Sequence, residues 1–302
     1  MRNNRREFLR VSALVAAGAV FVPKMARPAG SVLAARSGFS ERPRFLQGDS
    51  SRKVKNIGLQ LYSVRQDMLA DAAGTLKKVS AIGYKELESA RSDKGNYYGL
   101  APKEIKKITE DLGMRLRSGH IHVDGDFQRS IDQAAEAGQE YLISAVLPAP
   151  GQTVDNYQRA ADAFNKAGEA CKKSNLSFGY HNHNWEFDKV DGRALYDVLL
   201  DKTDPSLVKM EMDLGWVIAA GNDPLAYFEK YPGRFPLWHL KDMDMVKKQS
   251  TEFGKGQMDV AKILRHAKDS GMKHFFVEQE EYAHSALESL QIDYDYLAKL
   301  DY

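Results

Sequence analysis

From about residue 55 onward, the chain alternates between short apolar runs and longer amphipathic stretches. Apolar runs rich in β-branched and aromatic residues predict strands, and apolar positions three and four apart predict helices. The predicted strands are residues 56–64, 84–89, 114–121, 141–147, 176–181, 208–213, 237–241 and 274–278. The predicted helices are residues 71–82, 102–112, 126–137, 154–174, 193–200, 224–230, 260–270 and 286–300.

Strict alternation of strands and helices predicts a parallel sheet, and eight such units predict closure into a barrel. A doubly wound sheet would favour a glycine-rich phosphate turn after the first strand, where this chain reads YSVRQDM. Neither GxGxxG nor GxxxxGK[ST] occurs in the chain, so a bound nucleotide is not indicated. We therefore predict an α/β protein with a single (β/α)₈ TIM barrel over residues 54–302.

The first residues predict an export signal rather than part of the fold. Asn4 to Arg10 reads NRREFLR, and an apolar run over residues 11–22 follows it, which is typical of a twin-arginine signal. The run is short for a membrane span, and Ala34 and Ala35 offer a small-residue cleavage region. We predict a signal over residues 1–36, a flexible polar leader over 37–53, and a periplasmic mature protein.

Removal of the signal changes the charge of the chain. Residues 1–36 carry seven basic residues and one acidic residue, a net +6, whereas the whole chain is +2, so the mature chain is near −4. An acidic chain argues against a nucleic-acid surface. The single cysteine, Cys171, excludes an intramolecular disulfide and a thiolate metal cluster.

Four segments in the second half each end a strand-like run with side chains that can bind a metal. They are YHNH at 180–183, EMDLGW at 211–216, HLKD at 239–242 and VEQE at 277–280. In a parallel barrel the carboxyl ends of the strands converge on one face. The four segments therefore predict a metal site at that face. Each residue alone has a simpler interpretation, such as a turn cap for Asp213 or an ion pair for Glu278.

These segments also carry a resemblance. Together with NIGLQLYSVR, AGNDP and EFGKGQMD, their order is similar to that in xylose-isomerase-like barrels, a group that includes sugar phosphate isomerases/epimerases, inosose dehydratases and ketose 3-epimerases. The resemblance covers about residues 56–300. It implies one divalent cation held by residues from four successive strands, which here are His181, Asp213, His239 and Glu278.

His181 stands where the family has a glutamate. Two imidazoles and two carboxylates suit Mn, Fe, Co, Ni or Zn, and disfavour Mg, which prefers oxygen ligands. Residues 181 and 183 share a strand face, so the roles of His181 and His183 could be exchanged. We assign His181 to the metal and His183 to the substrate.

The chemistry that the resemblance implies is removal of a proton next to a sugar carbonyl, with a metal stabilising the enediolate. Lys241 could neutralise the developing oxyanion, or be a solvated lysine in a charged run. The candidate bases are His183, His120, Glu88, Glu186 and Glu278. Four aromatic residues are candidates to stack on a sugar ring, although most aromatic residues of a barrel serve packing: Tyr62, Trp185, Trp216 and Trp238.

Isomerisation, epimerisation and β-elimination share this first step, so the sequence alone does not choose among them. Export argues against a phosphorylated substrate. We expect an isomerase or epimerase of a free or glycosidic keto sugar, with a lyase or dehydratase acting on 3-keto sugars or inososes as the alternative. A non-catalytic periplasmic sugar-binding protein is the alternative from another class, and a metal-dependent nuclease is disfavoured by the acidic chain. Barrels of this kind often pair, so a homodimer is compatible with the resemblance.

Overall fold

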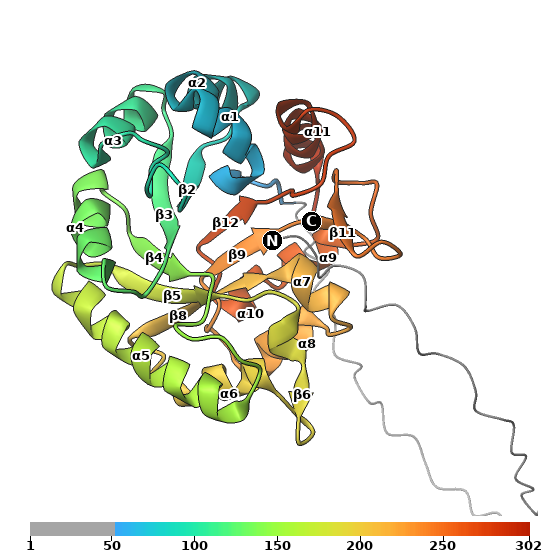
Figure 1. The fold of residues 1–302 in the computed structure, drawn as a ribbon. Coiled ribbons are helices and arrows are strands. Elements are labelled where there is room, and N and C mark those ends of the chain that lie inside the picture. The colour runs from blue at the N-terminus through green and yellow to red at the C-terminus, as the bar shows by residue number, and fades with distance from the viewer. Residues whose placement is uncertain (1–51) are drawn as a thin grey trace, which may run out of the picture. The chain divides into compact units, whose positions relative to one another are not determined.

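The computed structural model describes residues 52–302, and within them the chain forms a closed parallel barrel with helices around it (Figure 1). The barrel strands are β1 (Gly58–Gln60), β2 (Glu86–Ala90), β3 (Arg115–Ile121), β4 (Tyr141–Ser144), β5 (Ser177–His181), β8 (Val208–Asp213), β9 (Leu237–Leu240) and β12 (His274–Val277). Parallel pairing of β1 with both β2 and β12 closes the ring. The predicted fold is confirmed.

The helices lie on the outer side of the barrel, as Figure 1 shows, where all but α11 connect successive strands and α11 follows the last one. They are α1 (Arg65–Ala70), α2 (Ala72–Ile82), α3 (Pro102–Asp111), α4 (Phe127–Ala137), α5 (Val154–Lys173), α6 (Leu195–Lys202), α7 (Leu214–Ala219), α8 (Pro224–Lys230), α9 (Val260–Arg265), α10 (Ala267–Ser270) and α11 (Ala286–Lys299). No helix within residues 52–302 is long and apolar enough to cross a membrane.

Several boundaries differ from the prediction. The first strand ends at Gln60, because the Gln60 side chain accepts the Tyr62 N–H and starts the 3₁₀ helix η1 (Leu61–Val64). The predicted helix over 260–270 is interrupted at His266, which separates α9 from α10. Helix α7, the 3₁₀ helix η2 (Trp185–Phe187) and two small hairpins were not predicted: β6 (Lys189–Val190) with β7 (Arg193–Ala194), and β10 (Asp242–Asp244) with β11 (Gln249–Thr251).

The predicted signal, residues 1–36, and nearly all of the leader lie outside the described residues. The last two residues of that leader belong to the folded domain. Arg52 exchanges two backbone hydrogen bonds with Tyr302, at 3.0 and 3.1 Å, and Lys53 bridges to Asp301. The folded domain therefore includes residues 52 and 53, which pair with the last two residues of the sequence.

The barrel interior is layered, because alternate residues of each strand point inward. An apolar layer fills the middle, formed by Tyr141, Ile143, Leu237 and Phe276. Two residues further along the same strand as Leu237, His239 lies above this layer, with its ring 6.5 Å from that of Phe276. Polar side chains therefore occupy the carboxyl-terminal end of a barrel whose middle is dry.

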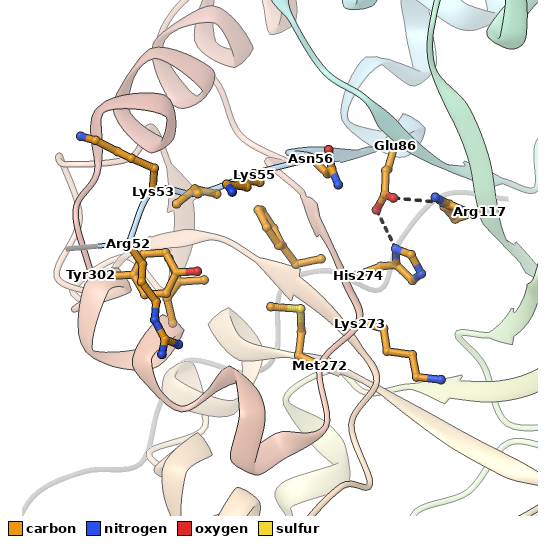
Figure 2. Close-up of a pocket in the computed structure, with 13 residues that line it drawn as sticks. Arg52, Lys53, Lys55, Asn56, Glu86, Arg117, Met272, Lys273, His274 and Tyr302 are labelled. Carbon is orange, nitrogen blue, oxygen red and sulfur yellow. Dashed lines mark hydrogen bonds and ion pairs between the residues drawn. The ribbon is translucent and has the colours of Figure 1, made fainter. Parts of the chain in front are cut away.

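Charged residues close the other end of the barrel (Figure 2). Glu86 accepts hydrogen bonds from Arg117 Nε at 3.0 Å and from His274 Nδ1 at 2.7 Å. They line a cavity of about 730 Å³ together with residues near both ends of the domain, including Lys55 and Tyr302. This cavity lies at the amino-terminal ends of the strands, the face of a TIM barrel that serves stability rather than catalysis.

The glycine-rich loop over residues 253–258 is organised by one buried carboxylate. Asp242 accepts backbone N–H groups from four residues: Met243, Gly254, Gly256 and Met258. Gly256 is required at its position, since a Cβ there would lie 2.1 Å from Asp242 Oδ1. The amide groups of both loop glycines are thus occupied within the protein.

We predict that Asp242→Ala lowers the free energy of unfolding by about 3 kcal/mol, because it leaves buried N–H donors without an acceptor. Urea denaturation measures the loss, and hydrogen exchange should show faster opening of residues 253–258. As a control, Asp244→Ala removes a carboxylate that accepts two N–H groups in the exposed turn of the neighbouring hairpin, and should cost less. Equal losses in the two variants would contradict this account of the loop.

Candidate active site

The four predicted metal ligands meet at the carboxyl-terminal end of the barrel. His181 ends β5, Asp213 ends β8, His239 lies in β9 and Glu278 follows β12. One ligand-capable atom from each lies within 4.8 Å of the others, and all four residues are buried. The structure therefore brings together the set that the sequence indicated, and its chemistry suits a divalent cation.

Asp213 serves two purposes. Its Oδ1 accepts the Trp216 N–H at 2.9 Å and caps α7, which is the simpler interpretation considered for this residue. Its Oδ2 is buried and forms an ion pair with Lys241, whose Nζ is 3.0 Å away. That oxygen faces the other three candidate ligands. Capping thus fixes the orientation of the carboxylate and turns its other oxygen toward Lys241 and the candidate ligands, where a divalent cation would meet it.

Lys241 lies within this group rather than in solvent. Its side chain is buried, and its Nζ is 3.0 Å from Asp213 Oδ2, 2.9 Å from Glu278 Oε2 and 2.5 Å from Glu280 Oε1. Burial alone would lower the pKa of Lys241, but these three carboxylates raise it above its ordinary value. The alternative of a solvated lysine is therefore wrong.

A second polar group lies deeper in the barrel. Glu211 Oε2 is 2.7 Å from His120 Nε2, and Glu88 Oε1 is 3.2 Å from the same nitrogen. Burial alone would lower the pKa of His120, but the two carboxylates raise it to about 10. Burial raises the pKa of Glu211 to about 7, and the charge of Glu88 acts in the same direction. Held between two carboxylates, His120 is better suited to balance charge than to accept a proton.

Glu211 was not among the predicted site residues. It lies two residues before Asp213 on β8 and therefore points to the same face. The spacing in EMD was the signal that could have identified it. With His120, His181 and His239, Glu211 forms a second group whose ligand-capable atoms lie within 4.8 Å of one another.

His183 borders the candidate ligands without joining either group. Its ring stacks on Trp185 with centroids 4.3 Å apart, and its Nδ1 is buried without a hydrogen-bond partner among residues 52–302. Burial lowers the pKa of His183 to about 3, and the charge of Lys241 acts in the same direction. A neutral imidazole beside the cluster is placed to act on a substrate.

Glu186 supports the backbone of His183 and belongs to neither group of candidate metal ligands. Its carboxylate accepts the Tyr180 hydroxyl at 2.5 Å and the His183 backbone N–H at 2.8 Å. The ring of Tyr180 packs against Phe164 of α5, outside the barrel. Burial raises the pKa of Glu186 to about 7, although these donors oppose the rise. The geometry favours a role in holding the turn that carries His183.

Of the four aromatic candidates, three lie near the site or in exposed positions, and one does not. Tyr62 and Trp185 are 39% and 43% exposed, and the Trp216 ring lies 5.1 Å from Lys241 Nζ. The prediction that Trp238 contacts substrate is wrong. Trp238 is fully buried and stacks on Phe228 of α8, because its neighbour His239 points into the barrel and alternate residues face opposite sides.

A family model for xylose isomerase-like TIM barrels matches residues 76–300. The chain belongs to this family. Its closed barrel and the cluster at the carboxyl ends of its strands agree with membership.

A sugar phosphate isomerase/epimerase from Parabacteroides distasonis is similar in structure, with a TM-score of 0.74 and 31% identity over 82% of this chain and 99% of that one. An inosose dehydratase from Bacillus cereus is 28% identical over 44% of this chain, and the match spans about half (49%) of that protein. A xylose isomerase-like barrel from Mycobacterium smegmatis in complex with magnesium, at 15% identity, TM-score 0.59 and coverage of 81% and 95%, shows the shared fold.

We predict that His181→Ala lowers divalent-metal affinity by more than about 100-fold, because residues that merely support metal ligands are already worth roughly 10- to 100-fold. His183→Ala should keep the metal. Equilibrium dialysis with elemental analysis measures both. Loss of metal in the His183 variant alone would reverse the assignment of the two histidines.

We also predict opposite effects of two tryptophan substitutions. Trp238→Ala should cost about 3–5 kcal/mol of stability, since it empties a buried site between β9 and α8. Trp185→Ala should leave stability nearly unchanged and raise KM by roughly 2- to 10-fold, as expected for loss of an exposed stacking ring. Denaturation and steady-state kinetics separate the two, and an unstable Trp185→Ala would argue that this ring is structural.

Proposed function

We propose that this protein is a divalent-metal-dependent isomerase or epimerase that removes a proton next to the carbonyl of a non-phosphorylated keto sugar or glycoside. The observation that carries the proposal is the convergence of His181, Asp213, His239 and Glu278 beside a neutral, half-buried His183. Membership of a family with isomerase/epimerase and dehydratase relatives supports an enzyme.

Each neighbouring side chain has a role in this reaction. A bound cation would polarise the carbonyl and the adjacent hydroxyl, and so acidify the carbon between them. His183 would accept the proton, since its ring borders the cluster and its Nδ1 has no hydrogen-bond partner among residues 52–302. Lys241 would balance the negative charge that develops on the substrate oxygen. The donor set of two imidazoles and two carboxylates suits Mn, Fe, Co, Ni or Zn better than Mg.

Two features support a substrate without phosphate. The amides of Gly254 and Gly256 already donate to Asp242, so this loop does not offer them to an anion. Glu280 adds a further carboxylate beside the cluster, with its Oε1 2.5 Å from Lys241 Nζ. A phosphate group would meet electrostatic repulsion there.

The second candidate function is a lyase or dehydratase acting on 3-keto sugars or inososes, which the similarity to an inosose dehydratase favours. It shares the proton abstraction and differs only in the loss of a β-substituent. A non-catalytic sugar-binding protein would use the same mouth without turnover.

The test is deuterium incorporation. The purified domain, loaded with Mn²⁺ or Co²⁺, is incubated in D₂O with free keto sugars and 3-keto glycosides, and the products are analysed by NMR after removal of the metal. We expect deuterium at the carbon beside the carbonyl, abolished by chelation. An epimer or isomer supports the first function, and an eliminated enone supports the second.

Asp213→Ala and His239→Ala should lose metal and exchange together while circular dichroism shows a folded domain. His183→Ala should keep metal and lose about 10²- to 10⁴-fold in exchange rate, the range for a general base. Full exchange in the Asp213 or His239 variant would exclude the proposed site. Sugar binding without exchange in the metal-loaded protein would indicate a binding protein.

Residues 1–36, outside the described part of the chain, are proposed to direct export of the folded protein to the periplasm. The basis is the Arg5–Arg6 pair followed by an apolar run and a small-residue region. Replacement of both arginines by lysine should keep the full-length precursor in the cytoplasm, as measured by cell fractionation and intact mass. Unchanged export of this variant would contradict the proposal that residues 1–36 are a twin-arginine signal.

A further inference from the structure

The two candidate histidine ligands each present their two ring nitrogens to different carboxylates. On the outer side, His239 Nδ1 is 2.8 Å from Glu278 Oε2 and 3.8 Å from Asp213 Oδ2. His181 Nε2 is 3.8 Å from the same Asp213 oxygen. The outer nitrogens are therefore Nε2 of one histidine and Nδ1 of the other.

The remaining nitrogens face inward, toward Glu211. His181 Nδ1 and His239 Nε2 each lie 3.3 Å from Glu211 Oε2. His239 Nε2 is also 2.6 Å from Glu88 Oε1, whose carboxylate accepts a hydrogen bond from Gln60. For His181 Nδ1, which has no hydrogen bond among the described residues, Glu211 is the acceptor within reach.

A neutral imidazole that gives a lone pair to a cation must carry its proton on the other nitrogen. When that N–H is buried, it needs an acceptor, and the acceptor fixes both the tautomer and the ring orientation. Glu211 is fully buried, and its Oε2, which is 2.7 Å from His120 Nε2, also faces both rings at 3.3 Å. One carboxylate can thus orient two ligands that come from different strands, β5 and β9.

We propose that Glu211 is a positioning residue that sets opposite tautomers in the two histidines. His181 carries its proton on Nδ1 and His239 carries its proton on Nε2, and Glu88 also accepts the Nε2–H of His239. The inference rests on the metal site of the proposed function and adds which nitrogens face the ion.

The competing arrangement places a cation in the deeper group, on His120, His181, Glu211 and His239. That arrangement uses the inner nitrogens and requires the reverse tautomers. The carboxylates of both groups already hold a cationic side chain, His120 in the deeper group and Lys241 in the outer one. The outer arrangement is favoured because its His181 borders the His183 ring. The tautomers therefore discriminate between the two.

The test is long-range ¹H–¹⁵N correlation NMR of the Zn²⁺-loaded mature domain labelled at its histidines. We expect His181 to show the Nδ1–H pattern and His239 the Nε2–H pattern, with the resonances assigned through His→Gln variants. Reversed patterns in both rings would overturn the proposal in favour of the deeper group. The same tautomer in the two rings would also overturn it.

Metal affinity gives a second readout. Glu211→Ala should lower Zn²⁺ affinity by about 10- to 100-fold, and Glu211→Gln, which keeps an oxygen acceptor, should restore much of it. Asp293→Asn is the control. It alters a buried carboxylate of α11 that accepts the Phe253 N–H away from both histidines, and should leave affinity unchanged.

The outcomes separate this inference from the proposed function. Unchanged affinity in a folded Glu211→Ala overturns the positioning role alone, while wild-type metal binding and exchange stand. Zn²⁺ binding with the expected tautomers, but no deuterium exchange on any sugar, supports the positioning role and overturns the proposed reaction. Failure of the wild-type domain to bind any divalent ion overturns both.

Discussion

Negative charge buried at one end of the barrel is the constraint on which the rest of the site depends. Glu88, Glu211, Asp213 and Glu278 are all at most 7% exposed. Buried carboxylates are tolerated only when cations and hydrogen-bond donors compensate them. Lys241, His120 and His239 supply that compensation from neighbouring strands, because the carboxylates raise the pKa of each. A divalent ion would add to the same balance, which is why the site suits a metal.

The barrel makes this concentration of charge possible by separating it from the rest of the interior. Alternation along β9 places Leu237 in the apolar layer and His239 above it, and alternation along β12 does the same for Phe276 and Glu278. The dry layer keeps the polar end apart from the Glu86 ion pairs at the other end. The two-residue period of the strands thus determines which side chains reach the polar end of the barrel, and in this way links the fold to the chemistry of the site.

The sequence was sufficient for the fold because eight repeats of one pattern admit few topologies, and for the four candidate ligands because parallel strand ends converge. It was less informative where a side chain's direction decides its role. Trp238 and Glu186 lie close in sequence to candidate ligands, yet Trp238 stacks on Phe228 of α8, and Glu186 binds Tyr180, whose ring packs against α5. Strand alternation could have excluded Trp238. Hairpin β10–β11 depends on Asp242 and its long-range contacts, which no local pattern reveals.

We propose that one divalent ion lies between the outer nitrogens of the two histidines and the carboxylates of Asp213 and Glu278. Anomalous diffraction from crystals of the Mn²⁺-loaded domain, measured with a chelated crystal as reference, tests it most directly. We expect one strong peak within bonding distance of all four residues. A peak beside His120 and Glu211 instead, or no peak in this end of the barrel, would contradict it.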